Sequence, residues 1–600
     1  MCGIAGIYSF DSSPPENEQI SRMIQVLQHR GPDGQGIFLD GALALGHRRL
    51  SIIDLECGAQ PMTSASGRAL IIFNGEIYNF LEWRRLLQGE GYRFKTNSDT
   101  EVILALYEKF GEGFLERLEG MFALALWDCL EKKLILARDR IGIKPLYYAH
   151  DDGRIAFASE IKAIHCVFPH LTELNPDSVN SYFTRQYIGG EDTIFKKVKK
   201  VPPGSFIKLT NKQQTLKYYW QPRPLRVESE ITDAAEELDA RFDAAVKGHL
   251  ISDVPMGLFL SGGIDSGCLL AYAAANSPEP IQTFSVGFGE ESEYSETRYA
   301  RILAKSFGSR HHEIQLGEKE MLAALPHIIR NLDEPLADYA ILPTYLMSRF
   351  AAEHVKVVLS GEGADEIFGG YKRYHLYSFL DSFKIRRNGD LIYGPCLFKD
   401  NERQQLLRDL FTPLAKLPAE QQMRTDKKHF AEAGQLNSVL YTDLRNWLVD
   451  DLLMKVDKMG MLASIEARVP YLDHHVVEFV LTLGGHLKVG WRARKRLLKK
   501  LVASRLPNEI LNRPKHGFTV PVAEWLRGPL LGTFHDAVMA NRSHSDWLDH
   551  NYVERLLAEH RKGKNLGLKL WSILIFCLWC QSATAKTGLA SVSASSNSNR

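Results

Sequence analysis

Cysteine is the second residue of this chain, so removal of Met1 would make Cys2 the first residue. Cys2 would then carry a nucleophilic thiol and a free α-amine on one residue. The α-amine has a reference pKa of about 7.7 to 8.0, so it can accept a proton near neutral pH and serve the thiol without a histidine. A cysteine at this position can arise by chance, so the prediction of a Cys2 nucleophile depends on the residues that follow.

A glycine-rich segment, LSGGIDS at 260–266, follows the apolar run VPMGLFL. Backbone N–H groups at a helix amino end form an anion site, and Gly262 and Gly263 let phosphate oxygens approach without a Cβ clash. The segment lacks the lysine of a GxxxxGK[ST] loop and resembles the loop of enzymes that release pyrophosphate from ATP. A flexible linker is the alternative, but the buried strand before it and the LLAYAAA helix after it favour an ATP site.

A second glycine-rich turn, VVLSGEGADEIFGGY at 357–371, again follows a strand and contains acidic residues. Two such loops can face each other across one site. Asp265 and Asp365 would then suit Mg²⁺, which binds through one or two carboxylates while phosphate supplies further oxygens. The alternative is that these carboxylates cap helices.

Four motifs near the amino terminus occur in the order CGIAG, RGPDG, RLSI and NGEIYN. They resemble the glutaminase domain of class II amidotransferases, in which the amino-terminal residue is the nucleophile. The resemblance implies that Arg49 holds the glutamine carboxylate with its planar fork, and that the Asn74 side chain and the Gly75 N–H form the oxyanion hole. Losing one such donor typically costs about 10² to 10³ in rate. An ordinary surface arginine and a hairpin turn at Asn-Gly are the structural alternatives.

The same resemblance implies that Glu76 and Asp99 bind the substrate amine. Asp99 stands where a helix is predicted to begin, so Ser98 or Asp99 would also serve as an ordinary N-cap. Both roles can coexist, because a cap residue can still offer one oxygen to a ligand. The glutamine site implied by the resemblance comprises Arg49, Leu50, Ser51, Ile52, Ile53, Asn74, Gly75, Glu76 and Asp99.

The second half of the chain resembles the synthetase domain of glutamine-hydrolysing asparagine synthetases. The resemblance implies that Glu362 serves the acyl-adenylate step and that Lys515 of RPKHGF stabilises the adenylate and pyrophosphate, with a solvated surface lysine as the alternative. The block EARVPYLDHH at 466–475 also fits the family, although its charged groups could simply form ion pairs between helices. The implied ATP site comprises Leu260, Ser261, Gly262, Gly263, Asp265, Ser266, Val286, Ser360 and Gly361.

Two kinds of element must position these residues. Up to about Lys217, short apolar runs bounded by Gly, Asp and Asn predict strands, with helices at 21–28 and 99–110. Further on, helices alternate with buried runs that end in Gly or Ser, which predicts an α/β domain with a parallel sheet and ligands at its carboxyl edge. The resemblance adds an α+β first domain, an amino-terminal-nucleophile αββα sandwich, before an α/β domain of the ATP-pyrophosphatase type.

Composition predicts the domain boundaries. The Pro-rich, charged segment WQPRPLRVESEITDA is typical of a linker, and the small polar residues after Gln581 are typical of a disordered tail. We therefore expect a glutaminase domain at 2–217, a linker at 218–232, a synthetase domain at 233–581 and a tail at 582–600.

The chain has 73 Lys plus Arg against 72 Asp plus Glu, so no global field favours nucleic acid or an anionic membrane. The amino terminus lacks the features of a secretory signal, which predicts a cytoplasmic protein. The longest apolar stretch, Leu568 to Cys580, is interrupted by Lys569 and is too short to cross a hydrocarbon core of roughly 30 Å, so we expect a buried helix. Cys577 and Cys580 within it lack a second pair or a nearby histidine, which favours packing over metal binding.

The resemblance as a whole implies that ammonia from glutamine attacks a carboxylate, by analogy aspartate, that ATP and Mg²⁺ have converted to an acyl-adenylate. The products would be asparagine, AMP and pyrophosphate. A different carboxylate acceptor, in a natural-product or polysaccharide pathway, is the first alternative. A relative that closes a β-lactam ring is disfavoured because it has no use for Cys2, and a non-catalytic scaffold is disfavoured because the motif residues are all present. The oligomeric state is open, with a homodimer as the candidate.

Overall fold

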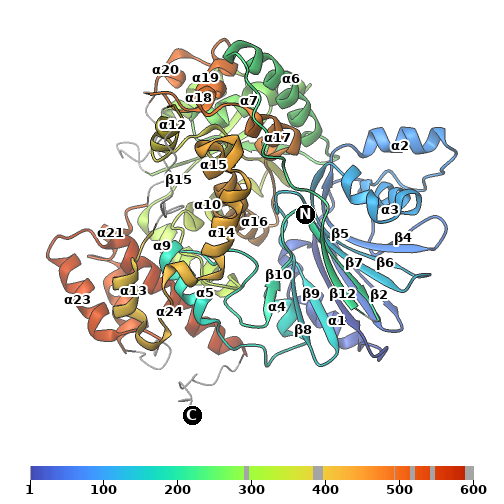
Figure 1. The fold of residues 1–600 in the computed structure, drawn as a ribbon, viewed down its shortest axis with the longest axis horizontal. Coiled ribbons are helices and arrows are strands. Elements are labelled where there is room, and N and C mark those ends of the chain that lie inside the picture. Colours follow the sequence, from blue (N-terminus) through green and yellow to red (C-terminus); the bar gives the residue numbers. More distant parts are fainter. Residues whose placement is uncertain are drawn as a thin grey trace.

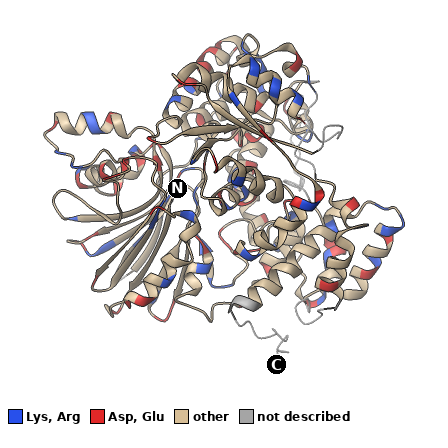
Figure 2. Ribbon diagram, turned by 180° about the vertical axis from the view of Figure 1, so that it is seen from behind, with Lys and Arg blue, Asp and Glu red and all other residues tan. Residues whose placement is uncertain are grey.

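The structure is a computed structural model that describes residues 2–211, 213–288, 296–382, 396–491, 493–513, 520–540 and 547–587. Three sheets organise the described chain: two six-stranded antiparallel sheets in the amino-terminal part and a five-stranded parallel sheet beyond it (Figure 1). Lys and Arg are interspersed with Asp and Glu over both parts (Figure 2).

The first sheet has the strand order β10-β8-β9-β1-β3-β2, and every neighbouring pair is antiparallel. Its strands are β1 (Gly3–Ser9), β2 (Gly34–Asp40), β3 (Leu43–Arg49), β8 (Tyr147–Asp151), β9 (Arg154–Ala158) and β10 (Val198–Lys200). The second antiparallel sheet has the order β12-β11-β7-β6-β5-β4. Its strands are β4 (Met62–Thr63), β5 (Ala69–Ile77), β6 (Gly120–Asp128), β7 (Lys133–Arg138), β11 (Ser205–Thr210) and β12 (Gln213–Tyr218).

These two sheets stack face to face. Alternate residues of a strand point to opposite faces, and Ile4 of β1 shares one core with Ile72 of β5 between the sheets. The opposite faces are covered by helices, because Ile7 packs with α1 and α4 whereas Phe73 packs with α3. The amino-terminal part is therefore the αββα sandwich implied by the resemblance. Its helices are α1 (Asn17–Gln25), α2 (Phe80–Gly89), α3 (Asp99–Phe110), α4 (Ile161–His165) and α5 (Pro176–Arg185).

The third sheet is parallel throughout, with the order β15-β14-β13-β16-β17. Its strands are β13 (Met256–Phe259), β14 (Gln282–Gly287), β15 (Arg310–Gln315), β16 (Val357–Leu359) and β17 (Glu466–Arg468). Leu258 packs against α6, α7 and α17, whereas Val358 packs with residues of α10 and α16, so helices cover both faces. This is the predicted α/β arrangement.

The helices of this second part are mostly short. They are α6 (Ile231–His249), α7 (Ile264–Asn276), α8 (Thr297–Ser306), α9 (Glu318–Asn331), α10 (Ile341–Ala351), α11 (Ala364–Phe368), α12 (Tyr374–Ser382), α13 (Asp400–Leu407), α14 (Pro418–His429), α15 (Gln435–Arg445), α16 (Met454–Leu462), α17 (His474–Thr482), α18 (Gly485–Lys488), α19 (Arg496–Val502), α20 (Asn508–Leu511), α21 (Val522–Trp525), α22 (Leu530–Phe534), α23 (His550–Arg561) and α24 (Gly567–Thr587).

Helix α24 is longer than the apolar stretch indicated. Its first 18 residues meet the length and composition of a membrane span, but 61% of that window is buried inside the protein, and Trp571 and Phe576 lie in the largest core. The burial of this helix thus confirms the expected core helix. Its length alone does not exclude a membrane span. The helix also extends through Thr587, six residues into the segment predicted as a tail; residues 588–600 lie outside the described part.

Candidate active sites

Cys2 and Asn74 come from the two stacked sheets and meet between them. Cys2 lies two residues before Ile4, and Asn74 lies two residues after Ile72. Residues two apart in an extended chain point to the same face, so Cys2 and Asn74 point into the space between the sheets, as Ile4 and Ile72 do. The Cys2 nitrogen donates to Asn74 Oδ1 at 2.8 Å. Asn74 is fully buried, and its Nδ2 has no hydrogen-bond partner among the residues that the structure describes. A buried, unpartnered amide donor beside a thiol is the group that an oxyanion hole requires.

Gly75 lies inside strand β5 opposite Phe122 of β6, so the hairpin-turn alternative is wrong. The N–H groups of Phe73 and Ile77 both face away from β6, because Phe73 N donates to Gln60 Oε1 and Ile77 N to Asp99 Oδ2. Backbone N–H direction alternates along a strand, so the Gly75 N–H faces the same edge, between these two. A Cβ on Gly75 would approach the Met121 carbonyl to 2.1 Å. Glycine is therefore needed at this position for packing on β6.

The Cys2 thiol is nearly enclosed. Cys2 is 8% exposed, its Sγ lies 3.9 Å from the Leu50 carbonyl oxygen, and burial raises the pKa of the thiol. A thiol of raised pKa needs an adjacent base in order to react, which is the role expected of the α-amine. The Arg30 Nε donates to the Cys2 carbonyl at 3.2 Å and holds the residue from the other side.

Two acidic side chains lie at the end of β5. Ser98 is the N-cap of α3, because its hydroxyl accepts from Thr100 N, so the Asp99 carboxylate is not the cap and instead bonds Ile77 N at 3.0 Å. Glu76 is buried one residue away. Burial raises the pKa of Asp99 to about 6 and the pKa of Glu76 well above its usual value. An ammonium group bound between them would favour both ionised forms.

Arg49 ends β3, and its guanidinium bonds the carbonyls of Ile53, Asp54 and Leu55. These bonds leave Arg49 Nε without a partner among the described residues. They also curl the expected glutamine-binding segment, residues 50–53, around the arginine. Leu50 and Ile52 of this segment are buried, and Ser51 N donates to Asp33 Oδ2 of the RGPDG motif at 2.8 Å.

Sequence reasoning missed the part that β17 plays at this site. Arg468 Nη2 lies 3.4 Å from Glu76 Oε1, and Arg468 Nε donates to Glu466 Oε1 at 2.6 Å. Although burial opposes ionisation, the surrounding positive charges, including those of Arg468 and Lys144, lower the pKa of Glu466. The EARVPYLDHH block was the available signal, but no local pattern shows that it packs against Glu76.

The two glycine-rich loops lie side by side at the carboxyl edge of the parallel sheet. Gly262 has φ +73°, and a Cβ there would approach the backbone of Ala300 in α8 to 2.8 Å. Ser261 and Ser266 bond each other across the first loop at 3.1 Å, and a Cβ on Gly361 would lie 3.5 Å from the Asp265 Cβ. The expected residues Leu260, Gly263, Val286 and Ser360 occupy the same edge, at or beyond the ends of β13, β14 and β16.

The carboxylates of Asp265 and Asp365 both form ion pairs with the side chain of Lys495. The Lys495 Nζ lies 2.6 Å from Asp265 Oδ1 and 2.5 Å from Asp365 Oδ1. The N-caps of α7 and α11 are Gly263 and Gly363, so neither carboxylate is a helix cap. The acidic pair therefore fits a cation-binding role, and Lys495 is a residue that the sequence did not single out.

Glu362 lies between β16 and α11, next to Gly361. Its charge acts on Lys455 and Asp451, which both come from the helical segment before β17. Lys515 falls at 514–519, outside the described residues.

Comparisons with known proteins identify the family. The asparagine synthase family model matches residues 237–581, and the glutamine amidotransferase domain model matches residues 1–220. Glutamine-hydrolysing asparagine synthetase 1 of Bacillus subtilis is 36% identical over 613 residues, covering 96% of each chain. Asparagine synthetase 3 of the same organism is 30% identical over 565 residues, covering 88% of this chain and 89% of its own. Amidase chry2 of Gibberella zeae is 28% identical over 627 residues, covering 88% and 90%.

A solved glutamine phosphoribosylpyrophosphate amidotransferase from Bacillus subtilis aligns with 52% of this chain and 81% of its own, at 17% identity and a TM-score of 0.29, which is too low to carry an argument. The family matches and the extent of the sequence identity do carry one. This chain belongs to the asparagine synthase family and is a glutamine-dependent amidotransferase of the asparagine synthase type.

Proposed function

We propose that this protein makes asparagine from aspartate, with glutamine as the nitrogen donor and ATP as the activating substrate. The observation that carries the glutaminase half of this proposal is the buried, unpartnered Nδ2 of Asn74, whose Oδ1 already binds the Cys2 nitrogen. One amide side chain thus orients the nucleophile and offers a donor to the charge that develops during attack.

In the glutaminase half, the Cys2 thiol attacks the glutamine amide. The α-amine of Cys2, which is free after Met1 is removed, accepts the thiol proton. Asn74 Nδ2 and the Gly75 N–H then stabilise the oxyanion, ammonia leaves, and water releases glutamate from the thioester. Glu76 and Asp99 bind the substrate amine, because both carboxylates lie at the end of β5 beside these donors. Arg49 binds the carboxylate, with the remaining contacts from Leu50, Ser51, Ile52 and Ile53.

In the synthetase half, the two glycine-rich loops bind ATP and Glu362 serves the acyl-adenylate step. The support is their placement, since Gly361 and Asp265 lie together at the carboxyl edge of a parallel sheet, where ligands bind in this class of fold. Leu260, Ser261, Gly262, Gly263, Ser266, Val286 and Ser360 complete the proposed ATP site, and Lys515 stabilises the adenylate and pyrophosphate.

Mg²⁺ belongs to the same proposal. Asp265 and Asp365 would hold the ion, because their oxygens already converge on one positive charge, the Lys495 ammonium. The ion would neutralise negative charge on the phosphates of ATP.

The relatives named as asparagine synthetases support aspartate as the acceptor. The second candidate, the same chemistry on another carboxylate, is kept because a relative that covers 88% of this chain, amidase chry2, is not named as an asparagine synthetase. AMP release across a panel of carboxylic acids, with aspartate first, separates the two. A cytoplasmic location and a homodimer complete the proposal, and light scattering of the purified chain tests the dimer.

The variant Cys2→Ala tests the two-site mechanism. It should abolish glutamine-dependent synthesis and retain synthesis from added ammonium, because the thiol acts only in ammonia production. Loss of both activities in a folded variant, or ADP among the products in place of AMP, would overturn the mechanism.

A further inference from the structure

A cavity of about 390 Å³ lies between the two halves of the protein, and none of the candidate active-site residues lines it. Its glutaminase side is formed by Tyr148 of β8, residues 189–192 and Tyr218 at the end of β12. Its synthetase side is formed by α14 and by Arg445 at the end of α15. The volume falls in the range of about 300 to 1,000 Å³ that is typical of small-molecule sites.

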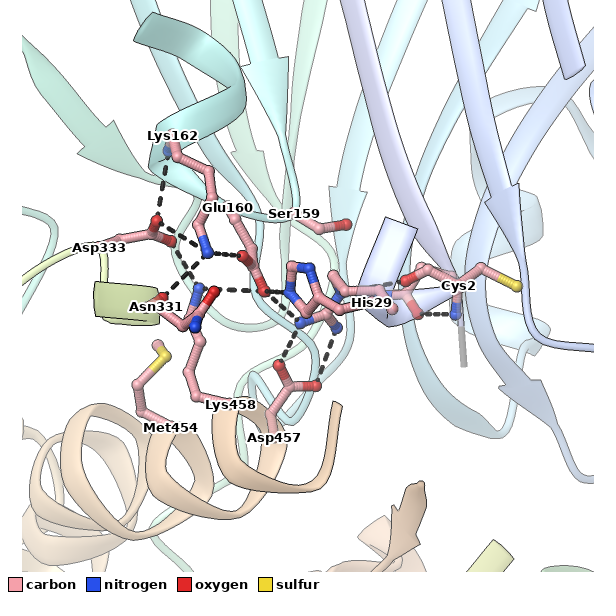
Figure 3. Close-up of polar contacts among 12 residues, drawn as sticks. Cys2, His29, Ser159, Glu160, Lys162, Asn331, Asp333, Met454, Asp457 and Lys458 are labelled. Atoms are coloured by element: carbon pink, nitrogen blue, oxygen red, sulfur yellow. Dashed lines mark hydrogen bonds and ion pairs between the residues drawn. The ribbon is translucent and has the colours of Figure 1, made fainter. Parts of the chain in front are cut away.

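Close to the nucleophile, charges that are buried between the halves are matched by charges of the opposite sign. The carboxylate of Asp457 accepts from both terminal nitrogens of Arg30, at 2.8 and 3.1 Å, in the cluster drawn in Figure 3. One lysine of the cavity is matched in the same way, because Lys200 Nζ lies 3.0 Å from Asp450 Oδ1. Such pairing is expected, since a buried charge without a partner is costly.

Two other charged side chains of the cavity lack a partner of opposite charge among the described residues. Arg445 Nη1 donates to the Pro203 carbonyl at 3.2 Å, while its Nε is buried without a hydrogen-bond partner. Asp426 is buried, and its carboxylate accepts from two neutral amides, those of Gln422 and Asn446, each at 3.0 Å. The cavity therefore contains one unmatched cation and one unmatched anion.

These two side chains lie in the same part of the cavity. Arg445 directly precedes Asn446 in the chain, and the Asn446 amide binds Asp426. The two amides fix the Asp426 carboxylate, and the Pro203 carbonyl holds one nitrogen of the Arg445 guanidinium. A molecule bound at this place therefore meets a positive and a negative group together, both held in place by the protein.

An α-amino acid matches this pair of charges, because it carries a carboxylate and an ammonium group on one carbon. The planar guanidinium of Arg445 suits the carboxylate, and the Asp426 carboxylate suits the ammonium group. Much of the remaining lining is apolar or aromatic and suits a bulky apolar side chain. This part of the lining comprises Tyr148, Pro202, Pro203, Tyr218, Pro418 and Val449.

We propose that the cavity is a second, non-catalytic site that binds an α-amino acid with a bulky apolar side chain. Arg445 holds its carboxylate and Asp426 holds its ammonium group. This inference goes beyond the proposed function and does not depend on it, because neither residue belongs to a candidate active site. The bound amino acid also joins the two halves, since the walls of the cavity come from both.

Isothermal titration calorimetry of the full chain with L-phenylalanine tests the proposal, because this amino acid is neither a substrate nor a product of the proposed reaction. The wild type should bind one molecule per chain. Two related ligands lack one charge each: 3-phenylpropionate has no ammonium group, and 2-phenylethylamine has no carboxylate. Each should bind at least about tenfold more weakly than L-phenylalanine, because one charge-assisted contact is lost.

The variants Arg445→Met and Asp426→Asn should each weaken the binding of L-phenylalanine at least about tenfold. Lys199→Met is the matched control, because Lys199 lines the same cavity but already forms an ion pair with Asp192. Its affinity should stay within about twofold of the wild type. L-phenylalanine should raise the melting temperature of the wild type and of Lys199→Met more than that of the other two variants.

An absence of binding up to about 10 mM L-phenylalanine would overturn the proposal. Equal affinities for the three ligands, wild-type affinity in Arg445→Met or Asp426→Asn, or an equal loss of affinity in Lys199→Met would also overturn it. If one of the first two variants does not fold, the other variant and the comparison of the three ligands on the wild type still decide the question.

Discussion

The sharpest prediction concerns Asn74→Asp, a change of one atom type at the candidate oxyanion hole. Asp keeps an acceptor for the Cys2 nitrogen, which now lies 2.8 Å from Asn74 Oδ1, but replaces the buried, unpartnered Nδ2 by an oxygen. The kcat for glutamine hydrolysis should fall about 10² to 10³-fold, or about 2.7 to 4 kcal/mol, because one of two oxyanion donors is lost. The KM for glutamine should change little, since Arg49, Glu76 and Asp99 are untouched.

The assay is steady-state glutamate release, with ammonium-dependent synthesis as a measure of an intact synthetase half. Gln60→Glu is the matched control, because Gln60 is a buried amide beside the same strand whose Oε1 accepts from Phe73 N and would still do so. A kcat for Asn74→Asp within about threefold of the wild type would refute the oxyanion assignment. So would an equal loss in Gln60→Glu, because the effect would then reflect a new buried carboxylate near β5 and not a missing donor.

Two further predictions follow from buried charges. The folded-state pKa of Asp99, about 6, lies above the roughly 3.9 of an unfolded aspartate, so the folded state gains stability as pH falls from about 6 to 4. The kcat/KM for glutamine should drop about tenfold between pH 7 and pH 5, because Asp99 takes up a proton. An unchanged dependence of kcat/KM on pH in Asp99→Asn would contradict this. Lys495→Met should lower the free energy of unfolding by roughly 1–3 kcal/mol, because Asp265 and Asp365 lose the ammonium group that they share. Mg²⁺ should raise the thermal stability of this variant more than that of Lys500→Met, the control at an exposed lysine. Equal responses of the two variants to Mg²⁺ would argue against a cation site at this pair.

Local periodicity predicted individual elements well where burial is regular. Helix α3 spans Asp99 to Phe110 and β6 spans Gly120 to Asp128, both as the apolar pattern indicates. The pattern was less exact at 21–28, where α1 instead occupies Asn17–Gln25, because helix ends depend on caps and contacts that periodicity does not encode. Motif spacing likewise predicted two loops at the carboxyl edge of a parallel sheet, because strand and loop alternate within each unit.

The sequence by itself determined which residues carry chemistry, through short motifs whose geometry is largely local, such as Gly262 and Gly263 before a helix. The tertiary structure decided which of them meet. Asn-Gly is a turn signal in isolation, yet the pairing of β5 with β6 extends Asn74 and Gly75 into a strand. The contacts of Arg468 with Glu76, of Asp457 with Arg30 and of Lys495 with two aspartates join residues 130 to 427 positions apart. Such contacts arise from the packing of whole sheets and helices, and no pattern of a few residues encodes them.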